Sequence, residues 1–129
     1  MIEQSLRTII LDDSTLSGLL AAGGVYPSFL PQGKATPCIV YQFEGPMPPL
    51  TAGGVHTVER YTVTLKVFSE TYGPTRDISK ALVTLLNGLS TTQGSTVIVS
   101  SRVLNVFSDY EDTLEMHTAI IDLSIHATE

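Results

Sequence analysis

The feature that most constrains the fold is a strict alternation of side-chain type over residues 60–69. One set of positions is apolar or aromatic: Tyr61, Val63, Leu65 and Val67. The set between them is polar or charged: Arg60, Thr62, Thr64 and Lys66. A period of two places the two sets on opposite faces of a strand. The segment is therefore predicted to be an antiparallel strand with one face buried in the core.

The other predicted elements surround this strand in a simple order. Apolar residues at helical spacing predict helices over about residues 2–11 and 73–87, and Asp13 or Ser14 can cap a short turn after the first. Strands are predicted at residues 38–43, 96–107 and 114–127. The order α-β-β-α-β-β packs most economically as an α+β fold. We expect a mainly antiparallel four-stranded sheet with two helices on one face.

Proline and glycine predict two irregular segments within a single domain, residues 1–129. Residues 25–37 contain Pro27, Pro31 and Pro37, which favour an extended connector. Residues 45–57 are predicted to be a long surface loop, and loops of this length in compact domains are commonly functional. A loop tip without contacts is the alternative. The candidate interface residues of this loop are Pro46, Met47, Pro48, Pro49, Leu50 and His56.

Charge is scarce and unevenly placed. Charged residues are 16% of the chain and the net charge is −6, whereas about 25% is usual. We therefore expect part of the surface to meet other protein. The excess acid lies after residue 108, and four of these residues form a candidate acidic turn on a ring face or bore: Asp109, Glu111, Asp112 and Glu115. A solvated turn is the alternative, and the acidic balance disfavours tight binding of nucleic acid.

The polar face of the sheet is also expected to carry apolar side chains. Those placed on it are Cys38, Val40, Phe68, Ile98, Leu104, Val106 and Ile120. This set is too apolar to be fully wet. The sequence therefore predicts that a neighbouring subunit covers this face.

Residues that carry chemistry are few and scattered. Cys38 is the only cysteine, which excludes an internal disulfide and is typical of a small core residue in a reducing compartment. His56, His117 and His126 have no spacing that would aim two imidazoles at one metal ion. No apolar run suggests a secretory signal or a membrane span. We expect a soluble protein that is not an enzyme, with no catalytic residue, cofactor or metal site.

Six short segments, taken in order, resemble the tail-completion or tail-terminator proteins of long-tailed bacteriophages. They are Gly24-Val25-Tyr26-Pro27, Leu30-Pro31-Gln32, Thr36-Pro37-Cys38-Ile39-Val40-Tyr41, residues 60–69, Thr71-Tyr72-Gly73 and Asp109-Tyr110-Glu111. The resemblance implies a structural virion protein that forms a ring, usually of six copies. Such a ring caps the tail tube, ends its polymerisation and joins the tail to the head connector.

The partners that the resemblance implies are further copies of the chain, the tail tube protein and the head-connector protein, with DNA passing through the ring. The implied location is the upper end of the virion tail, after assembly in the host cytoplasm. Two alternatives stay open. One is a head-completion or neck protein, and the other is a small cytosolic ligand-binding or enzyme domain.

Overall fold

The computed structural model describes residues 2–20, 24–27, 36–47, 58–112 and 115–128. Within these residues the helices are α1 (Ile2–Asp12), α2 (Ser14–Leu19) and α3 (Tyr72–Leu86). The strands are β1 (Val25–Pro27), β2 (Cys38–Met47), β3 (Glu59–Ser69), β4 (Thr91–Gln93), β5 (Thr96–Glu111) and β6 (Met116–Thr128).

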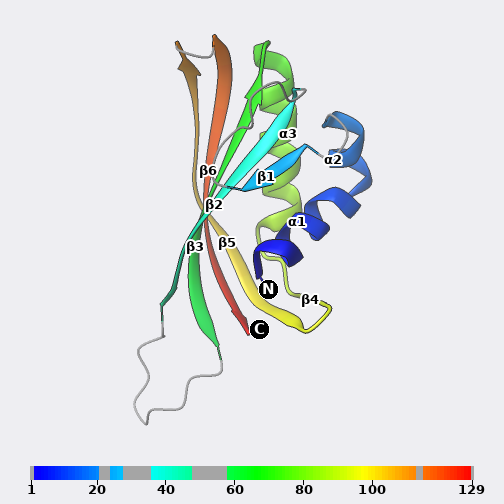
Figure 1. The fold of residues 1–129 in the computed structure, drawn as a ribbon, viewed down its shortest axis with the longest axis vertical. Coiled ribbons are helices and arrows are strands. Elements are labelled where there is room, and N and C mark those ends of the chain that lie inside the picture. The colour runs from blue at the N-terminus through cyan, green and yellow to red at the C-terminus, as the bar shows by residue number, and fades with distance from the viewer. Residues whose placement is uncertain (1, 21–23, 28–35, 48–57, 113–114, 129) are drawn as a thin grey trace.

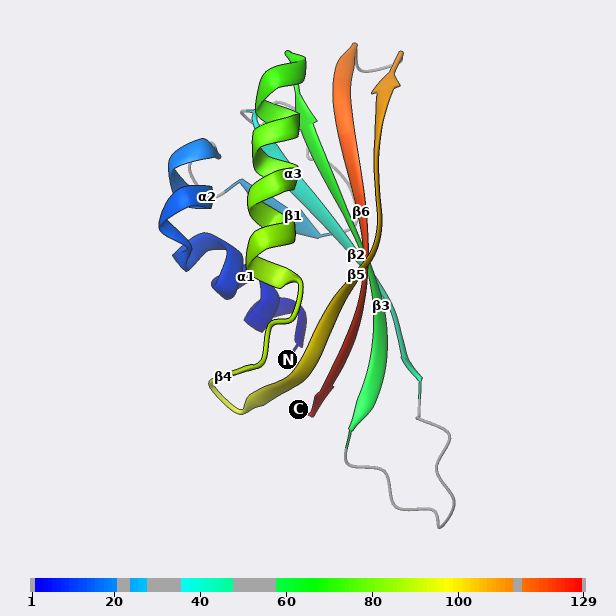
Figure 2. The same cartoon turned by 180° about the vertical axis from the view of Figure 1, so that it is seen from behind.

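The described strands form one six-stranded sheet in the order β1-β2-β3-β6-β5-β4. β1 pairs with β2 in parallel, and the other neighbouring strands pair in antiparallel. The sheet is strongly twisted, and the helices all lie on one side of it (Figures 1 and 2). We call the other side the helix-free face.

The expected four-stranded antiparallel sheet with two helices is wrong. The sheet is mixed, because β1 lies in the segment predicted to be an irregular connector and pairs in parallel with β2. β4 adds a second short strand at the opposite edge. The turn predicted after Asp13 is a helix of its own, capped by hydrogen bonding of the Leu16 amide to Asp13 Oδ2 at 3.1 Å. Strands of three residues are too short to show a period of two, so the sequence pattern missed them.

The core lies between the sheet and the helix layer. The alternation over residues 60–69 is confirmed, because its apolar set is buried on the helix side of β3. Facing side chains on α3 are also fully buried. The core positions of α3 and β6 are Ile78, Leu82, Leu86, Ala119, Ile121, Leu123, Ile125 and Ala127.

The predicted loop over residues 45–57 begins later than expected. β2 continues to Met47, with a bulge between Glu44 and Met47. Gly45 has a φ of 112°, a left-handed conformation that favours glycine, and the bulge accommodates Pro46, which has no N–H to donate. Pro46 and Met47 are thus strand residues. Pro48, Pro49, Leu50 and His56 lie outside the described residues.

Three of the apolar residues expected on the helix-free face are covered within the chain, whereas Leu104 is 54% exposed. Cys38, Val40 and Phe68 form a small buried cluster, against which Tyr26 and Met116 pack. The expected burial of these three residues by a neighbouring subunit is therefore not needed. Ile98 and Val106 were placed on the same face, but they pair with Ala127 and Ile121 of the main core and lie on the helix side instead. Two bulges in β5 change which of its residues face the helices.

Candidate functional site

Strand β5 lies near one edge of the sheet. Along its first half, other segments of the chain already bond to the side of β5 that faces away from β6. β4 pairs with residues 96–98. Beyond residue 98, the segment that follows α3 forms hydrogen bonds to the edge of β5 that a neighbouring strand would otherwise form. The Gly88 amide donates to the Ser101 carbonyl at 2.7 Å, and the Val103 amide donates to Asn87 Oδ1 at 3.1 Å. Edge pairing by another chain is blocked along this half.

The second half of β5 is an open edge, which we call the arm edge and define as residues 104–111. A bulge between Val103 and Asn105 precedes it. An antiparallel ladder points the backbone groups of every second residue away from its partner strand. The Tyr110 amide donates to the Asp109 side chain, at 2.8 Å from Oδ1, and not to β6. Tyr110 therefore belongs to the set of residues whose backbone groups point outward. Val106 and Ser108 share this parity, and no described residue bonds to their outward backbone groups.

Apolar side chains are exposed along the arm edge. Leu104 is 54% exposed, Val106 44%, Phe107 43% and Tyr110 46%. An open strand edge can template pairing with another chain, and natural proteins usually protect such edges with lysine or proline. Residues 104–108 contain no charged residue and no proline. This surface is therefore suited to being covered by another protein.

The acidic residues chosen from the sequence lie at the end of the arm edge. Asp109 and Glu111 belong to β5 rather than to a turn. Asp112 and Glu115 lie in the connection to β6, where the Glu115 amide donates to the Asp112 carbonyl at 3.3 Å. Glu115 has a φ of 53°, which is uncommon for a residue with a side chain. The four carboxylates thus occupy one end of the β5–β6 hairpin.

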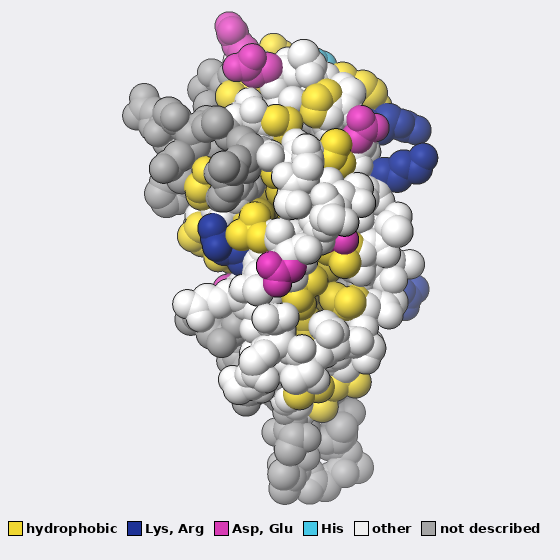
Figure 3. Space-filling view, turned by 90° about the vertical axis from the view of Figure 1, so that its right-hand side faces the viewer, with side chains coloured by type: hydrophobic (Ala, Val, Ile, Leu, Met, Phe, Trp, Pro, Cys, Tyr) yellow, Lys and Arg dark blue, Asp and Glu magenta, His cyan; other side chains and the backbone are white. Residues whose placement is uncertain are grey.

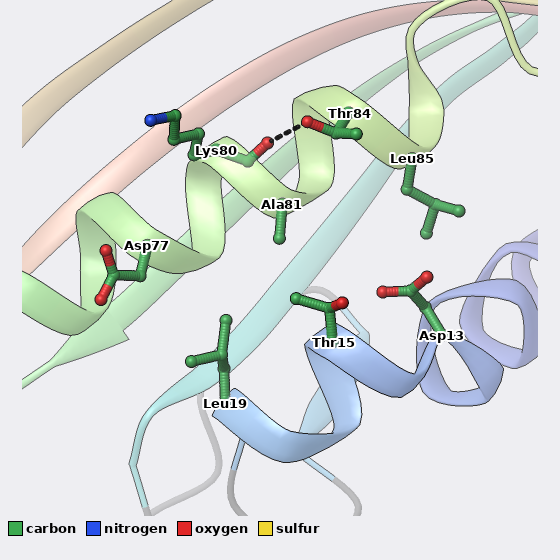
Figure 4. A pocket seen from close by; sticks show the side chains of 8 residues that line it. All are labelled: Asp13, Thr15, Leu19, Asp77, Lys80, Ala81, Thr84 and Leu85. Atoms are coloured by element: carbon green, nitrogen blue, oxygen red, sulfur yellow. Dashed lines mark hydrogen bonds between the residues drawn. The ribbon is translucent and has the colours of Figure 1, made fainter.

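An open groove of about 660 Å³ separates α2 from α3 (Figure 4). Leu19 and Ala81 point toward each other across it. Hydrophobic side chains also surface along the middle of this helix-covered side of the molecule (Figure 3). Two of the polar lining groups serve their own helices: Asp13 caps α2, and Thr84 Oγ1 donates to the Lys80 carbonyl at 3.0 Å. The other polar residues that line the groove are Thr15, Asp77 and Lys80.

The histidines with described positions have local partners. The ring of His117 lies 5.0 Å from that of Tyr110 and 5.9 Å from that of Tyr72, measured between centroids. His126 Nδ1 lies 3.4 Å from Ser100 Oγ. Within the described ranges, no group of three or more His, Cys, Asp or Glu side chains could hold a metal ion. In the same part of the chain, no helix is both long enough and apolar enough to cross a membrane.

Cys38 is fully buried. Burial disfavours the thiolate and raises the pKa of the Cys38 thiol from 9.0 to about 11. A thiol with a raised pKa is a poor nucleophile at neutral pH. This agrees with its predicted role as a small core residue.

The raised pKa of Cys38 makes stability depend on pH in the alkaline range. The unfolded chain loses the thiol proton near pH 9, whereas the folded chain keeps it to about pH 11. The free energy of unfolding should therefore be unaffected by this group below pH 9 and should fall by roughly 2–3 kcal/mol as the pH rises to 11. Urea unfolding at several pH values measures this loss. A Cys38→Ala variant should lack this component, and equal slopes in both proteins would contradict the assignment.

Comparison with known proteins identifies a matching family and a solved structure with a similar fold. The family model described as "Tail completion protein gp17" matches residues 4–127. A chain from a structure titled "Virion of native gene transfer agent (GTA) particle" matches with a TM-score of 0.73 and 14% sequence identity. That match covers 99% of this chain and 95% of the other. No curated protein matches the sequence.

Proposed function

The chain belongs to the gp17 family of tail completion proteins, and from this premise we propose that it forms a ring on the end of the tail tube. The ring ends polymerisation of the tube and joins the tail to the head connector. Membership of this family makes the chain a structural protein of a tail, and such proteins are normally not enzymes. Six copies, the tail tube protein and the head-connector protein are the proposed partners.

The observation that carries this proposal is the arm edge. Four large apolar side chains are exposed there: Leu104, Val106, Phe107 and Tyr110. Beside them lie the outward backbone groups of Val106 and Ser108, to which no described residue bonds. Such a surface is a liability in a free protein and becomes useful once another chain covers it. A protein that ends one polymer and starts a junction needs a surface of this kind.

The helix-free face suits the bore of the proposed ring. Polar side chains occupy the middle of it, and Thr64 Oγ1 donates to Asp122 Oδ1 at 3.1 Å across the β3–β6 pair. Placing this face toward the bore leaves the helices on the outside. DNA would then pass a polar wall on which the cations Arg60, Lys66 and Arg102 are interspersed with the carboxylates of Asp122, Asp109 and Glu111, and these carboxylates weaken the hold on its phosphates.

The acidic end of the β5–β6 hairpin is proposed to lie on a face of the ring. A position in the bore was the other possibility considered from the sequence. We favour the face because the carboxylates adjoin the arm edge, which has to be covered. Carboxylates there also select partners by charge, which acts over about 10 Å in physiological salt.

Deletion of the gene tests the proposed function directly. In cells that produce the remaining tail proteins, we expect tails of irregular, excessive length that do not attach to filled heads. Electron microscopy measures both features, and supplying the intact gene in trans should restore them. Joined tails of normal length in its absence would overturn the proposal.

A head-completion or neck protein is the alternative, and the same cells distinguish it. A tail-capping ring should copurify with headless tails. A neck protein should instead copurify with filled, tailless heads. Mass spectrometry of the two separated particle fractions decides between them.

A further inference from the structure

We propose that the arm edge binds an extended strand of a second tail protein, in which apolar residues alternate with lysine or arginine. The inference rests on the proposed function, because it assigns a partner to one surface of the proposed ring. It names the partner by its chemistry. The contact is the addition of a strand to the open edge of β5.

The backbone provides the first part of the argument. Val106, Ser108 and Tyr110 point their N–H and C=O groups away from β6. A strand added beside β5 can bond to all three residues in an ordinary ladder. Asp109 Oδ1 occupies the Tyr110 amide in the free protein at 2.8 Å, so this side chain has to move when a strand binds. The Asp109 carboxylate is then available to a cationic side chain.

The side chains define what the added strand must carry. Directly paired residues lie on the same face of a sheet. Val106 pairs with Ile121, which is in the main core, so Val106 and Tyr110 face the helix side. Asp109 and Glu111 belong to the alternate set, on the helix-free face. A matching strand therefore presents apolar residues on one face and cations on the other.

A second copy of this chain fits the arm edge poorly. Two arms paired with each other would bring together four carboxylates from each copy: Asp109, Glu111, Asp112 and Glu115. At the opposite edge of the sheet, β1 and the part of β2 not paired with it, residues 42–47, contain neither lysine nor arginine. Among the described strands, none at an edge supplies the cations that the arm edge calls for.

Synthetic peptides test the inference on the intact protein. A short peptide that alternates valine and lysine should bind, whereas one that alternates valine and glutamate should not. Amide hydrogen exchange should show new protection at Val106, Ser108 and Tyr110. A valine–lysine peptide methylated on the backbone nitrogens of its pairing edge keeps its charge but cannot form the ladder. We expect that peptide to bind at least about tenfold more weakly.

Two variants separate the backbone from the charge. Ser108→Pro removes an outward amide at a position where proline is tolerated at an edge, and it should weaken binding about tenfold, whereas Ser108→Ala should not. The double variant Asp109→Lys with Glu111→Lys should reverse the preference in favour of the glutamate peptide. Circular dichroism of each variant checks that the fold is retained.

Several results would overturn the inference. Binding that is unchanged by backbone methylation and by Ser108→Pro would be electrostatic attraction alone. Absence of binding, or equal binding of both peptides, would also refute it. Protection of the same amides by self-association, without peptide, would make a second copy the occupant. These results leave the gene-deletion test unaffected, so failure of the partner assignment and failure of the tail function are distinguishable.

Discussion

Replacement of Leu82 by alanine is expected to lower the free energy of unfolding by about 3 kcal/mol. Leu82 is fully buried in α3, on the side that packs against the sheet. The substitution removes apolar contacts and leaves a cavity in the centre of the core. Alanine is the best helix former, so the substitution does not weaken the helix itself. The loss therefore measures packing between α3 and the sheet.

A control for this variant lies on the same helix. Thr84 is exposed, and its hydroxyl donates to the Lys80 carbonyl within α3. Thr84→Ala should change the free energy of unfolding by no more than about 0.5 kcal/mol. Urea unfolding, with the slope against urea concentration unchanged, measures both variants. A loss below about 1 kcal/mol for Leu82→Ala would show that α3 does not pack on the sheet as described.

The sequence predicted the elements in which side-chain pattern and burial agree. β3 is one case, because its alternation reflects a core on one face and polar side chains on the other. The long helix α3 is another, because its apolar stripe is the side that packs on the sheet. Both elements are long enough to show a period. Their packing partners could be inferred from the same pattern.

The two edges of the sheet were not predictable in this way. β1 has three residues and ends in Pro27, and β4 also has three. Strands this short form because a longer neighbour offers its edge, so tertiary contacts decide them. The bulges of β5 had a similar effect. They shift the alternation twice, so Ile98 and Val106, both predicted on the polar face, lie on the helix side together with Val103 between them.

The candidate site was predictable only in part. The excess of acid after residue 108 led to Asp109 and Glu111, which are the acidic residues of the arm edge. The open edge itself could not be found, because it depends on where β4 ends and on the contacts of Asn87 and Gly88 with β5. One signal was present in the sequence. Residues 104–108 form an uncharged run without proline near the end of a predicted strand.

Placing lysine at two exposed positions of the arm edge is expected to abolish assembly while the fold is kept. Leu104 and Phe107 are 54% and 43% exposed, so Leu104→Lys with Phe107→Lys should change the free energy of unfolding by less than about 1 kcal/mol. In the assembled tail, the partner would cover positions 104 and 107 and so bury the two introduced lysine side chains. The proposed partner strand also carries cations, so it would repel them. Burial without a counter-charge is costly. We expect the yield of joined particles to fall at least about tenfold.

The matched control places one lysine at an exposed position away from the arm edge. Ser90 lies between α3 and β4, and Ser90→Lys should leave both folding and particle yield unchanged. Plaque or transfer titre, together with electron microscopy of the tails, measures the outcome. Normal titre from the double-lysine variant would mean that the arm edge stays exposed in the tail. Its apolar side chains would then have no role in joining, and the surface that carries the proposed function would have to be sought elsewhere on the sheet.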